Sequence, residues 1–419
     1  MERLRRVLGH VVPPPSDAEV LERCVNVHEI EREGSERLRH RNPAAEAYYA
    51  SGAEDEVALR GNRDAWARWR IAHRVLRGVP DGTRDTRVTL FGHELAFPIV
   101  AAPTAYCKLA HADGELGVAQ ACASHGIAQC LSTMSTTSVE EVGATWASAT
   151  GVATGGRLWF QLYVFRDREL VRGLVRRAEA AGCTALLVTV DAPVLGQRER
   201  DARNRFELPK GLEAANLTGA ARRVGHDVEA KAVGGKAGGE EEDPGVASGI
   251  AAHFAKNVDA TLTWADAEWL VQLTRMPVVL KGVVRPEDAV RARQVGCKGI
   301  VVSNHGGRQL DHCVATLDAL PAIRRALDAE RVSGVAQDFH VLVDGGVRRG
   351  TDILKAVALG ADAVMIGRPL LWGLALGGTR GADKVLRLLI TEFTRAMALA
   401  GCGSLRDVTP DLLVPAPPL

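Results

Sequence analysis

The sequence has almost no net charge, few aromatic residues and no long apolar run. Lys and Arg number 52 against 51 Asp and Glu, which leaves a formal net charge of +1. Such a balance gives no overall field to attract nucleic acid or an anionic membrane. No apolar stretch approaches the roughly 20 residues that cross a bilayer, and the most apolar stretches, such as Ala185–Val190, have the length of a strand. The sequence therefore predicts neither a nucleic-acid partner nor a membrane span.

The cysteines lack the spacing of a metal site or of a redox pair. The eight of them include no CxxC pair, so we expect reduced thiols in an intracellular protein and no bound metal. Residues 1–12 contain no apolar segment long enough for a secretory signal. No Walker A motif and no strand-linked GxGxxG occurs, which argues against nucleotide sites of these two kinds.

Glycine, by contrast, is abundant, at 43 of 419 residues, which suits tight turns and backbone that approaches a ligand closely. From about residue 97, short runs rich in Val, Ile and Leu alternate with longer amphipathic segments, the pattern of repeated βα units. Such continuous apolar runs are typical of parallel strands buried on both faces. Eight strands are expected, at Pro98–Pro103, Ala128–Thr133, Leu158–Tyr163, Ala185–Asp191, Val278–Gly282, Gly299–His305, His340–Gly346 and Ala363–Pro369.

Amphipathic stretches between these runs predict helices, at Glu115–His125, Asp167–Ala181, Pro286–Val295, Ala315–Leu327 and Gly350–Leu359. Eight strands, each followed by a helix, form a (β/α)8 TIM barrel of about 250 residues or more, and residues 97–400 have that size. Periodicity does not distinguish a closed barrel from an open, doubly wound sheet, which stays the alternative. Before the barrel, the first forty residues read as charged and irregular, with short helices expected near Ala44–Tyr49 and Asp55–Trp69.

The expected organisation is an N-terminal extension over residues 1–42 and a barrel domain over residues 43–414. More residues separate Asp191 from Val278 than one helix needs, which predicts a long insertion after the fourth strand. Its centre, Ala230–Gly249, is poor in apolar bulk and rich in Gly, Glu and Lys. A flexible surface insertion over about 215–255 is therefore expected, either as a lid over the site or without a function.

Every expected strand ends in polar or small residues, and the carboxyl ends of the strands carry the active site in barrel enzymes. The motifs DGGVRRG and GRP follow the last two strands. Their glycines allow backbone N–H groups to cradle a phosphate, while Arg348 and Arg368 supply positive charge. These two ends therefore predict a phosphate site.

His305 is the candidate general base, because it stands at a strand end among small residues. Asp191 ends another strand, and a carboxylate beside His305 would orient the ring and stabilise its protonated form. Arg308 and Arg198 suit a bidentate grip on a substrate carboxylate. Lys281, directly after an apolar run, is placed to hold charge that develops on a cofactor ring.

Six motifs carry a resemblance to a known family: YYASGAEDE, FQLYVFRDR, TVDAPVLGQRERDARNRF, VLKGV, SNHGGRQLD and DGGVRRGTD. From about Pro43 to Val414 the chain resembles the FMN-dependent 2-hydroxy acid oxidases, which include glycolate oxidase and lactate oxidase. The resemblance implies FMN as cofactor and oxidation of a small (S)-2-hydroxy acid, L-lactate and/or glycolate, to the 2-oxo acid. O₂, reduced to H₂O₂, is the expected oxidant, because no haem domain precedes the barrel. A quinone- or cytochrome-coupled dehydrogenase and a non-catalytic flavin-binding scaffold are the alternatives.

The resemblance also implies roles for individual residues. In this family the histidine of SNHGGRQ takes the substrate's proton, a role that falls to His305 with Asp191 as its partner. The route is either carbanion formation or hydride transfer with His305 taking the hydroxyl proton. The implied substrate contacts are Tyr48, Tyr163, Arg198 and Arg308, and the implied catalytic set is His305, Asp191, Tyr163 and Lys281. The implied FMN contacts are Pro103, Thr104, Ala105, Ser132, Gln161, Tyr163, Thr189, Lys281, Ser303, Asp344, Gly345, Gly346, Val347, Arg348, Gly367 and Arg368.

Two pocket positions depart from the plant glycolate oxidase pattern. LSTMSTTS stands where that pattern has LSSWATSS, so Met134 replaces a pocket tryptophan. The smaller, flexible side chain leaves room beside the substrate's Cα substituent, which favours L-lactate, with glycolate as a second substrate. PTAY stands for PTAM, which puts Tyr106 in place of methionine. Mandelate-type oxidases also carry an aromatic residue there, so an aryl or longer-chain 2-hydroxy acid is the alternative.

Assembly and location are inferred from the same resemblance. Family members are usually tetramers or octamers, so we expect a homotetramer or homo-octamer. The chain ends in Pro417-Pro418-Leu419, which is not the carboxy-terminal import tripeptide of the plant enzymes. Arg3-Leu4, five residues and His10-Val11 resemble the amino-terminal peroxisomal signal, with Val11 as the one mismatch. A peroxisomal location is therefore expected in a eukaryotic source, with a cytoplasmic protein or a mitochondrial presequence as alternatives.

Overall fold

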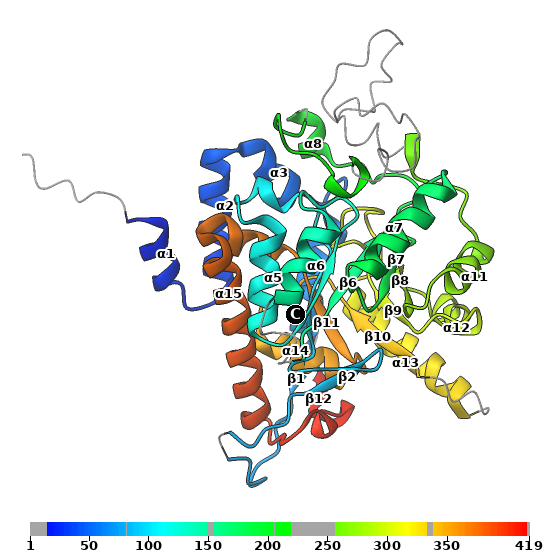
Figure 1. Cartoon of the computed structure of the whole chain (residues 1–419). Helices are drawn as coiled ribbons and strands as arrows, with labels where there is room; N and C mark the ends of the chain where they lie inside the picture. Colours follow the sequence, from blue (N-terminus) through cyan, green and yellow to red (C-terminus); the bar gives the residue numbers. More distant parts are fainter. Residues whose placement is uncertain are drawn as a thin grey trace, which may run out of the picture.

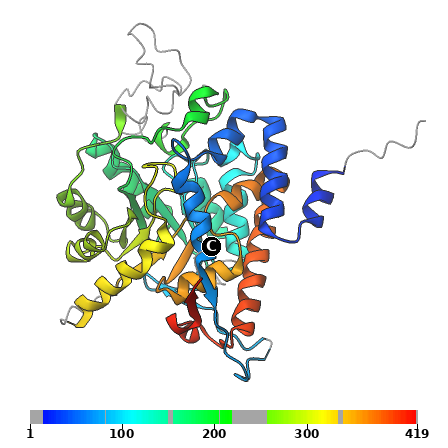
Figure 2. The ribbon, with the colours of Figure 1, turned by 180° about the vertical axis from the view of Figure 1, so that it is seen from behind.

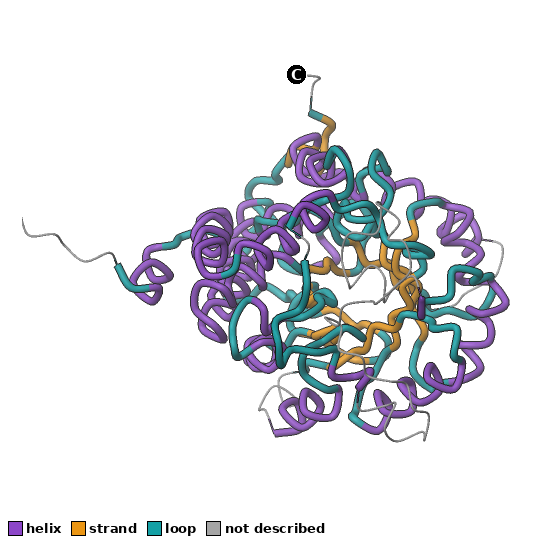
Figure 3. The backbone as a smooth tube through the Cα atoms, turned by 90° about the horizontal axis from the view of Figure 1, so that it is seen from above, coloured by secondary structure: helices purple, strands orange, loops and turns teal. Residues whose placement is uncertain are grey.

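Eight parallel strands close into a barrel in the computed structural model, which describes residues 15–80, 82–148, 155–204, 206–218, 256–332 and 338–416. Each strand pairs with its neighbours in chain order, and the last pairs with the first, which confirms the TIM barrel and excludes the open sheet. Viewed along its axis, the ring of strands lies inside a ring of helices (Figure 3). The barrel strands are β4 (Ile99–Ala101), β5 (Ala128–Leu131), β6 (Leu158–Leu162), β7 (Leu186–Thr189), β8 (Val278–Val283), β9 (Gly299–Val302), β10 (His340–Val343) and β11 (Ala363–Ile366).

A hairpin fills one end of the barrel. Strands β2 (Val88–Leu90) and β3 (His93–Leu95) pair antiparallel, and their apolar residues join the core inside the barrel. The ring of Phe91, at the turn, packs 5.2 Å from Trp159 and 4.9 Å from His340. This packing leaves the carboxyl ends of the strands as the end at which a cavity can form.

The outer helices cover the barrel as the amphipathic pattern predicts (Figure 1). In α7, for example, the apolar side chains at 171, 174, 175 and 178 are buried, and Asp167 caps the helix by accepting from the N–H groups of Glu169 and Leu170. All five expected helices are found within a few residues of their predicted bounds, apart from a longer α13. The outer helices are α5 (Gly114–Ser124), α6 (Val139–Ser148), α7 (Arg168–Ala180), α11 (Trp264–Leu273), α12 (Pro286–Gln294), α13 (Thr316–Val332), α14 (Gly350–Ala358) and α15 (Arg368–Leu399).

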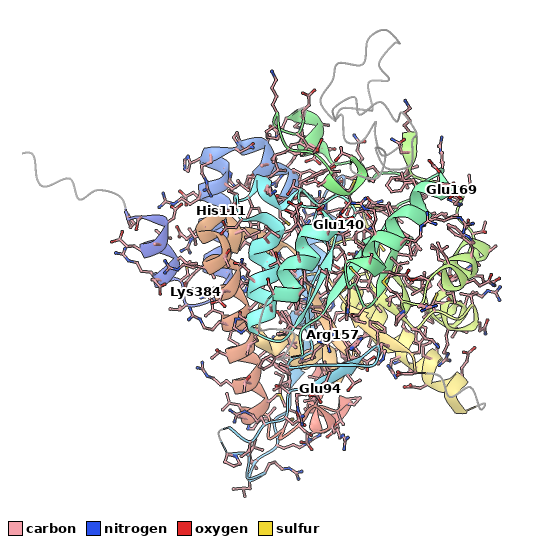
Figure 4. The ribbon with its side chains drawn as sticks, in the orientation of Figure 1. Glu94, His111, Glu140, Arg157, Glu169 and Lys384 are labelled. Carbon is pink, nitrogen blue, oxygen red and sulfur yellow. The ribbon has the colours of Figure 1, made fainter. Side chains whose placement is uncertain are left out.

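The expectation of an irregular start to the chain is wrong for the described residues. Helices α1 (Asp17–Arg23) and α2 (Val27–Arg41) precede the barrel, and α2 packs along α15 (Figure 2). The buried residues of α2 recur every three or four positions, at 27, 30, 34 and 38, but charged residues between them hide the pattern. Lys384 of α15, labelled in Figure 4, donates to the carbonyls of Leu21 and Glu22 and so holds the end of α1 against α15.

Short elements carry the chain from α2 into the barrel. They are α3 (Pro43–Ala50), α4 (Val57–Asp64), the 3₁₀ turn η1 (Ala65–Arg68) and β1 (Trp69–Ile71). Strand β1 pairs antiparallel with β12 (Leu413–Pro415), so the two ends of the barrel region lie together. The remaining short elements are η2 (Cys107–Leu109), α8 (Glu199–Arg203), η4 (Leu405–Asp407) and η5 (Pro410–Leu412).

Several predicted segments lie outside the described residues. They are the amino-terminal signal at residues 3–11, most of the insertion at 215–255, and residues 417–419. The boundary between extension and barrel domain at residue 43 stays a prediction. Within the described part of the chain, no helix is both long and apolar enough to cross a bilayer. All eight cysteines are unpaired.

Candidate active site

A cavity lies at the carboxyl ends of the barrel strands. It encloses about 1170 Å³ of empty space, including its open mouth. All the candidate site residues line it except Asp191 and Ser303, each of which contacts a residue that does. Those that line it are Tyr48, Pro103, Thr104, Ala105, Tyr106, Ser132, Met134, Gln161, Tyr163, Thr189, Arg198, Lys281, His305, Arg308, Asp344, Gly345, Gly346, Val347, Arg348, Gly367 and Arg368.

His305 and Asp191 form a hydrogen-bonded pair beside this cavity. Nδ1 of His305 lies 2.9 Å from Oδ1 of Asp191. Asp191 can take this position only because residue 282 in β8 is glycine, where a Cβ would lie 2.5 Å from Cβ of Asp191. Gly282 also has φ +114°, which a residue with a side chain rarely adopts. The geometry therefore brings together the two groups that the sequence proposed as base and partner.

The charges around this pair set the protonation states. Burial lowers the pKa of His305 below its ordinary value, and the cations Lys281 and Arg198 lower it against the opposing effect of Asp191. Burial alone would raise the pKa of Asp191, but His305 and Lys281 more than offset it, so this pKa is also lowered. At neutral pH the pair is therefore a neutral imidazole on an ionised carboxylate, the state in which His305 can accept a proton.

The loop that carries His305 is held by a residue that the sequence did not single out. His305 has φ +59°, a left-handed conformation. The amide groups of Asn304 and Asn62 bond to each other in both directions, at 2.7 and 2.9 Å. Oδ1 of Asn304 also accepts from the N–H of Gly307 at 3.1 Å. Asn304 lies within the SNHGGRQ motif, but its partner in α4 is too distant in the chain for any local pattern to reveal.

Arg308 and Arg198 both line the cavity. Nη1 of Arg308 donates to the carbonyls of Tyr48 and Ser51, at 2.6 and 3.1 Å, and its guanidinium lies 5.0 Å from the Tyr48 ring. The bonds of Arg198 to Arg308 O and Gln309 Oε1 are both 3.4 Å long, so its donors are weakly engaged. Burial and the charge of Arg308 lower the pKa of Arg198 to about 10, so it stays charged at neutral pH. A carboxylate between them would relieve their repulsion.

Lys281 is buried and forms an ion pair, so it is not an exposed lysine in a surface salt bridge. Its Nζ donates to Ser303 Oγ at 3.1 Å and lies 3.4 Å from Asp344 Oδ2. Burial lowers its pKa, but the carboxylates of Asp344 and Asp191 outweigh that effect, so the net shift is upward. Lys281 is thus a fixed positive charge beneath the cavity.

The arginines after β10 and β11, where the sequence predicts a phosphate site, have different partners. Arg368 donates to the carbonyls of Tyr49, Gly306 and Ser51 at 2.9 to 3.0 Å. Arg348 instead makes a two-point ion pair with Glu31 of α2, at 2.8 and 3.1 Å, which the sequence did not predict. Although burial acts against it, Arg348 and Arg63 lower the pKa of Glu31 to about 2.

Two observations show that FMN suits this cavity. Burial and the nearby cations Arg308, Arg348 and Arg63 lower the pKa of Arg368 well below its ordinary value, so an anion such as a phosphate would stabilise its charge. Oδ1 of Asp344 is buried and has no hydrogen-bond partner among the described residues. A ribityl hydroxyl would supply the missing donor.

The substrate end of the cavity is aromatic. Tyr48 stacks on Phe206, with ring centroids 4.6 Å apart and planes 9° apart. Tyr106 and Met134 are both buried there, and the backbone N–H of Tyr106 donates to Met134 O at 3.0 Å. The sequence reading missed Phe206, although it closes the motif TVDAPVLGQRERDARNRF, and missed Tyr49, the second tyrosine of YYASG.

A closed barrel with a flavin-suited cavity, a histidine–aspartate pair and two arginines defines a flavin-dependent oxidoreductase acting on an anionic substrate. The model of the FMN-dependent dehydrogenase family matches residues 38–415. The chain belongs to this family, and FMN is its cofactor.

Named relatives are similar over nearly the whole chain. An L-lactate oxidase of Nostoc sp. is 48% identical over 375 residues, which are 89% of this chain and 94% of the relative. Human 2-hydroxyacid oxidase 1 is 42% identical, covering 87% of this chain and 90% of its own length. The crystal structure of a mandelate oxidase with (S)-4-hydroxymandelic acid superimposes with a TM-score of 0.79 at 40% identity, covering 93% of this chain and 98% of that one. The chain is an FMN-dependent hydroxy acid oxidase.

Proposed function

We propose that the chain oxidises a small (S)-2-hydroxy acid, L-lactate and/or glycolate, to the 2-oxo acid and reduces O₂ to H₂O₂. The observation that carries the proposal is the contact of 2.9 Å between His305 and Asp191 beside the arginines 198 and 308. A base and a carboxylate-binding pair at one cavity match an acid whose hydroxyl stands next to its carboxylate. The similarity to relatives named L-lactate oxidase and glycolate oxidase supports this substrate class.

Each side chain then has a role. Arg308, Arg198 and Tyr48 hold the substrate carboxylate, and His305 accepts a proton from the substrate while Asp191 orients the ring. Burial and the charge of Asp191 raise the pKa of Tyr163 to about 12, so its hydroxyl stays protonated and can donate to the substrate. The substrate loses two electrons and two protons in total, which reappear in H₂O₂.

FMN supplies the acceptor for these two electrons when it is bound. Lys281 would provide positive charge under its ring, and Arg368 with the glycines 345, 346 and 367 would hold its phosphate. Arg348, already paired with Glu31, would contribute charge to the same end. The other proposed contacts along FMN are Pro103, Thr104, Ala105, Ser132, Gln161, Tyr163, Thr189, Ser303, Asp344 and Val347.

Met134 favours L-lactate within this class, because a flexible thioether beside the substrate leaves room for a methyl group. An aryl 2-hydroxy acid such as mandelate is the second candidate, because mandelate-type oxidases also carry an aromatic residue where Tyr106 stands, and similar structures are those of mandelate oxidase. One methyl group changes specificity by only about 1–3 kcal/mol, so glycolate and L-lactate should overlap.

Specificity constants for glycolate, L-lactate and L-mandelate test the substrate. A clear preference for glycolate would contradict the argument from Met134, and a preference for L-mandelate would favour the aryl alternative. The yield of H₂O₂ per 2-oxo acid tests the oxidant. A yield near one supports the oxidase, whereas turnover only with a quinone or cytochrome acceptor would support a dehydrogenase.

For assembly, the family resemblance supports a homotetramer or homo-octamer of 43–414 barrels, each preceded by the extension 1–42. Light scattering would measure this, and a monomer would contradict it. For location, the pattern Arg3-Leu4 with His10-Val11 supports the peroxisome in a eukaryotic source. A fluorescent fusion of residues 1–40 tests it, and a diffuse or mitochondrial signal would contradict it.

A further inference from the structure

Tyr106 adopts a backbone conformation that a bulky residue rarely takes. Its φ is +55° and its ψ is +45°, in the left-handed region. Its side chain is buried, lines the cavity and lies 6.2 Å, centroid to centroid, from the ring of Tyr48. Strained conformations of this kind persist only where the surrounding structure holds them. The direction of the Tyr106 ring therefore depends on the groups that hold its backbone.

Three hydrogen bonds hold it. The N–H of Tyr106 donates to Met134 O at 3.0 Å. The Tyr49 hydroxyl donates to Tyr106 O at 2.6 Å. The N–H of the next residue, Cys107, donates to Oε1 of Glu115 at 3.0 Å. The peptide group before Tyr106 is thus held by Met134, from the loop after β5. The peptide group after it is held at its carbonyl by Tyr49 of α3 and at its N–H by Glu115 of α5.

Glu115 is a buried carboxylate with an unusual number of donors around it. Only 1% of its surface is exposed. Besides Cys107, it accepts from the N–H of Thr136 at 2.8 Å, from the Thr136 hydroxyl and from the Thr137 hydroxyl at 2.8 Å. It stands in the first turn of α5, where a negative charge is favourable. Glu115 therefore joins the loop after β4, which carries Tyr106, to the loop after β5, which carries Met134.

We propose that Tyr49 and Glu115 are positioning residues that set which 2-hydroxy acids the cavity accepts, because they hold Tyr106 in its left-handed conformation. Neither needs to touch the substrate for this effect. The inference rests on the proposed function in one respect, since it takes the space beside Tyr106 and Met134 as the place for the substrate's Cα substituent.

The direction of the effect follows from the geometry. Without the hydrogen bonds from Tyr49 and to Glu115, the Tyr106 backbone can relax out of the left-handed region, and its ring then leaves the wall of the cavity. The cavity gains room, so acids with a large substituent gain relative to small ones. We expect Tyr49→Phe and Glu115→Gln each to raise the ratio of kcat/KM for L-mandelate over L-lactate by about tenfold, at the low end of what pocket contacts contribute to specificity.

The same two substitutions in a protein that lacks the Tyr106 side chain distinguish loss of the hold on Tyr106, called the clamp below, from a general disturbance of the cavity. In Tyr106→Gly the residue takes positive φ without strain and has no ring to direct. Adding Tyr49→Phe or Glu115→Gln to that background should leave the substrate ratio within about twofold, since the two mutated sites would no longer be coupled. Equal shifts in both backgrounds would overturn the proposal. Tyr49→Phe keeps its ring packing, so it carries the test if Glu115→Gln does not fold.

Binding keeps this proposal distinct from the proposed function. Calorimetry on the FMN-loaded protein gives the affinities for pyruvate and benzoylformate, the 2-oxo acids of lactate and mandelate. If the wild type turns over neither acid yet the variants shift the binding ratio toward benzoylformate, the proposed function fails and the clamp stands. If the ratio is unchanged in folded, FMN-loaded Tyr49→Phe and Glu115→Gln, the clamp is wrong. A wild type that binds neither compound overturns both.

Discussion

His305 and Asp191 meet at 2.9 Å although 114 positions separate them in the chain. Since the carboxylate of Asp191 has no proton to give, Nδ1 of His305 is the donor, and Nε2 of the neutral ring is left as an acceptor. The pair therefore fixes both the orientation of the imidazole and the tautomer that can take a proton.

Replacement of His305 by Ala should lower kcat by at least the roughly 10²-fold that a general base contributes. The FMN-binding ends of β10 and β11 are untouched, so the variant should keep its flavin absorbance. Stopped-flow reduction of the enzyme-bound FMN by L-lactate measures the step directly. A variant with full flavin content and near-normal rate would remove His305 from the role of base.

The pH dependence should follow the titration of His305. Only the neutral ring can accept a proton, so kcat/KM rises as pH passes upward through its pKa and then levels off. Because burial and neighbouring cations lower that pKa, the acidic limb should lie below the ordinary histidine value of about 6.5. Asp191 opposes this lowering, so Asp191→Asn should move the limb to still lower pH and also slow turnover. A limb that moves to higher pH in this variant would contradict the charge assignment.

Arg368 should govern FMN affinity. Loss of a hydrogen bond to a charged group costs about 1.5–3 kcal/mol, so Arg368→Gln should raise the FMN dissociation constant roughly ten- to a hundredfold. Fluorescence titration of the apoprotein with FMN measures it. Arg74→Gln is the matched control, because Arg74 pairs with Asp411 and does not line the cavity. Equal effects of the two substitutions would show that general loss of stability is responsible.

The amide pair between Asn62 and Asn304 should be strongly coupled. Either single change to Ala leaves the other buried amide without its partner, at a cost of about 1–3 kcal/mol in the free energy of unfolding. The double variant has neither side-chain amide left without the other, although the N–H groups of Gly307 and Thr316 lose the same acceptors as in the single variants. It should therefore lose clearly less than the sum of the two single losses. Urea unfolding of the four FMN-loaded proteins gives the cycle, and additive losses would contradict the coupling.

The barrel strands were predictable because each is a continuous apolar run closed by polar residues. Closure of the barrel was not, since the pairing of β11 with β4 joins segments that no local pattern links. Helix α2 was missed for a related reason. Its buried face is only one residue wide per turn, and its stability comes from packing on α15, where a Cβ on Gly34 would lie 2.3 Å from Trp372 O.

The sequence predicted those site residues that stand at strand ends or within recognisable motifs. His305, Asp191, Lys281 and the arginines stand at carboxyl ends that the barrel brings to one cavity. Groups that act through contacts between distant segments were not. Glu31 neutralises part of Arg348 from a helix that precedes the barrel, and Glu115 collects donors from two loops. Buried contacts of these two kinds leave no trace in the spacing of either partner along the chain.

The pairing of β1 with β12 has a consequence for how the protein is made. Residues 69–71 cannot pair until residues 413–415 are present, and the ribosome adds these only after every barrel strand has been translated. Helix α3, which brings Tyr48 to the cavity, and helix α4, which brings Asn62 to Asn304, precede η1 and β1 in the chain. Co-translational folding can thus assemble the barrel progressively, but β1 can pair only after β12 has been synthesised. In a nascent chain, the segment that follows α3 and α4 would therefore gain its strand partner only after residues 413–415 have been translated.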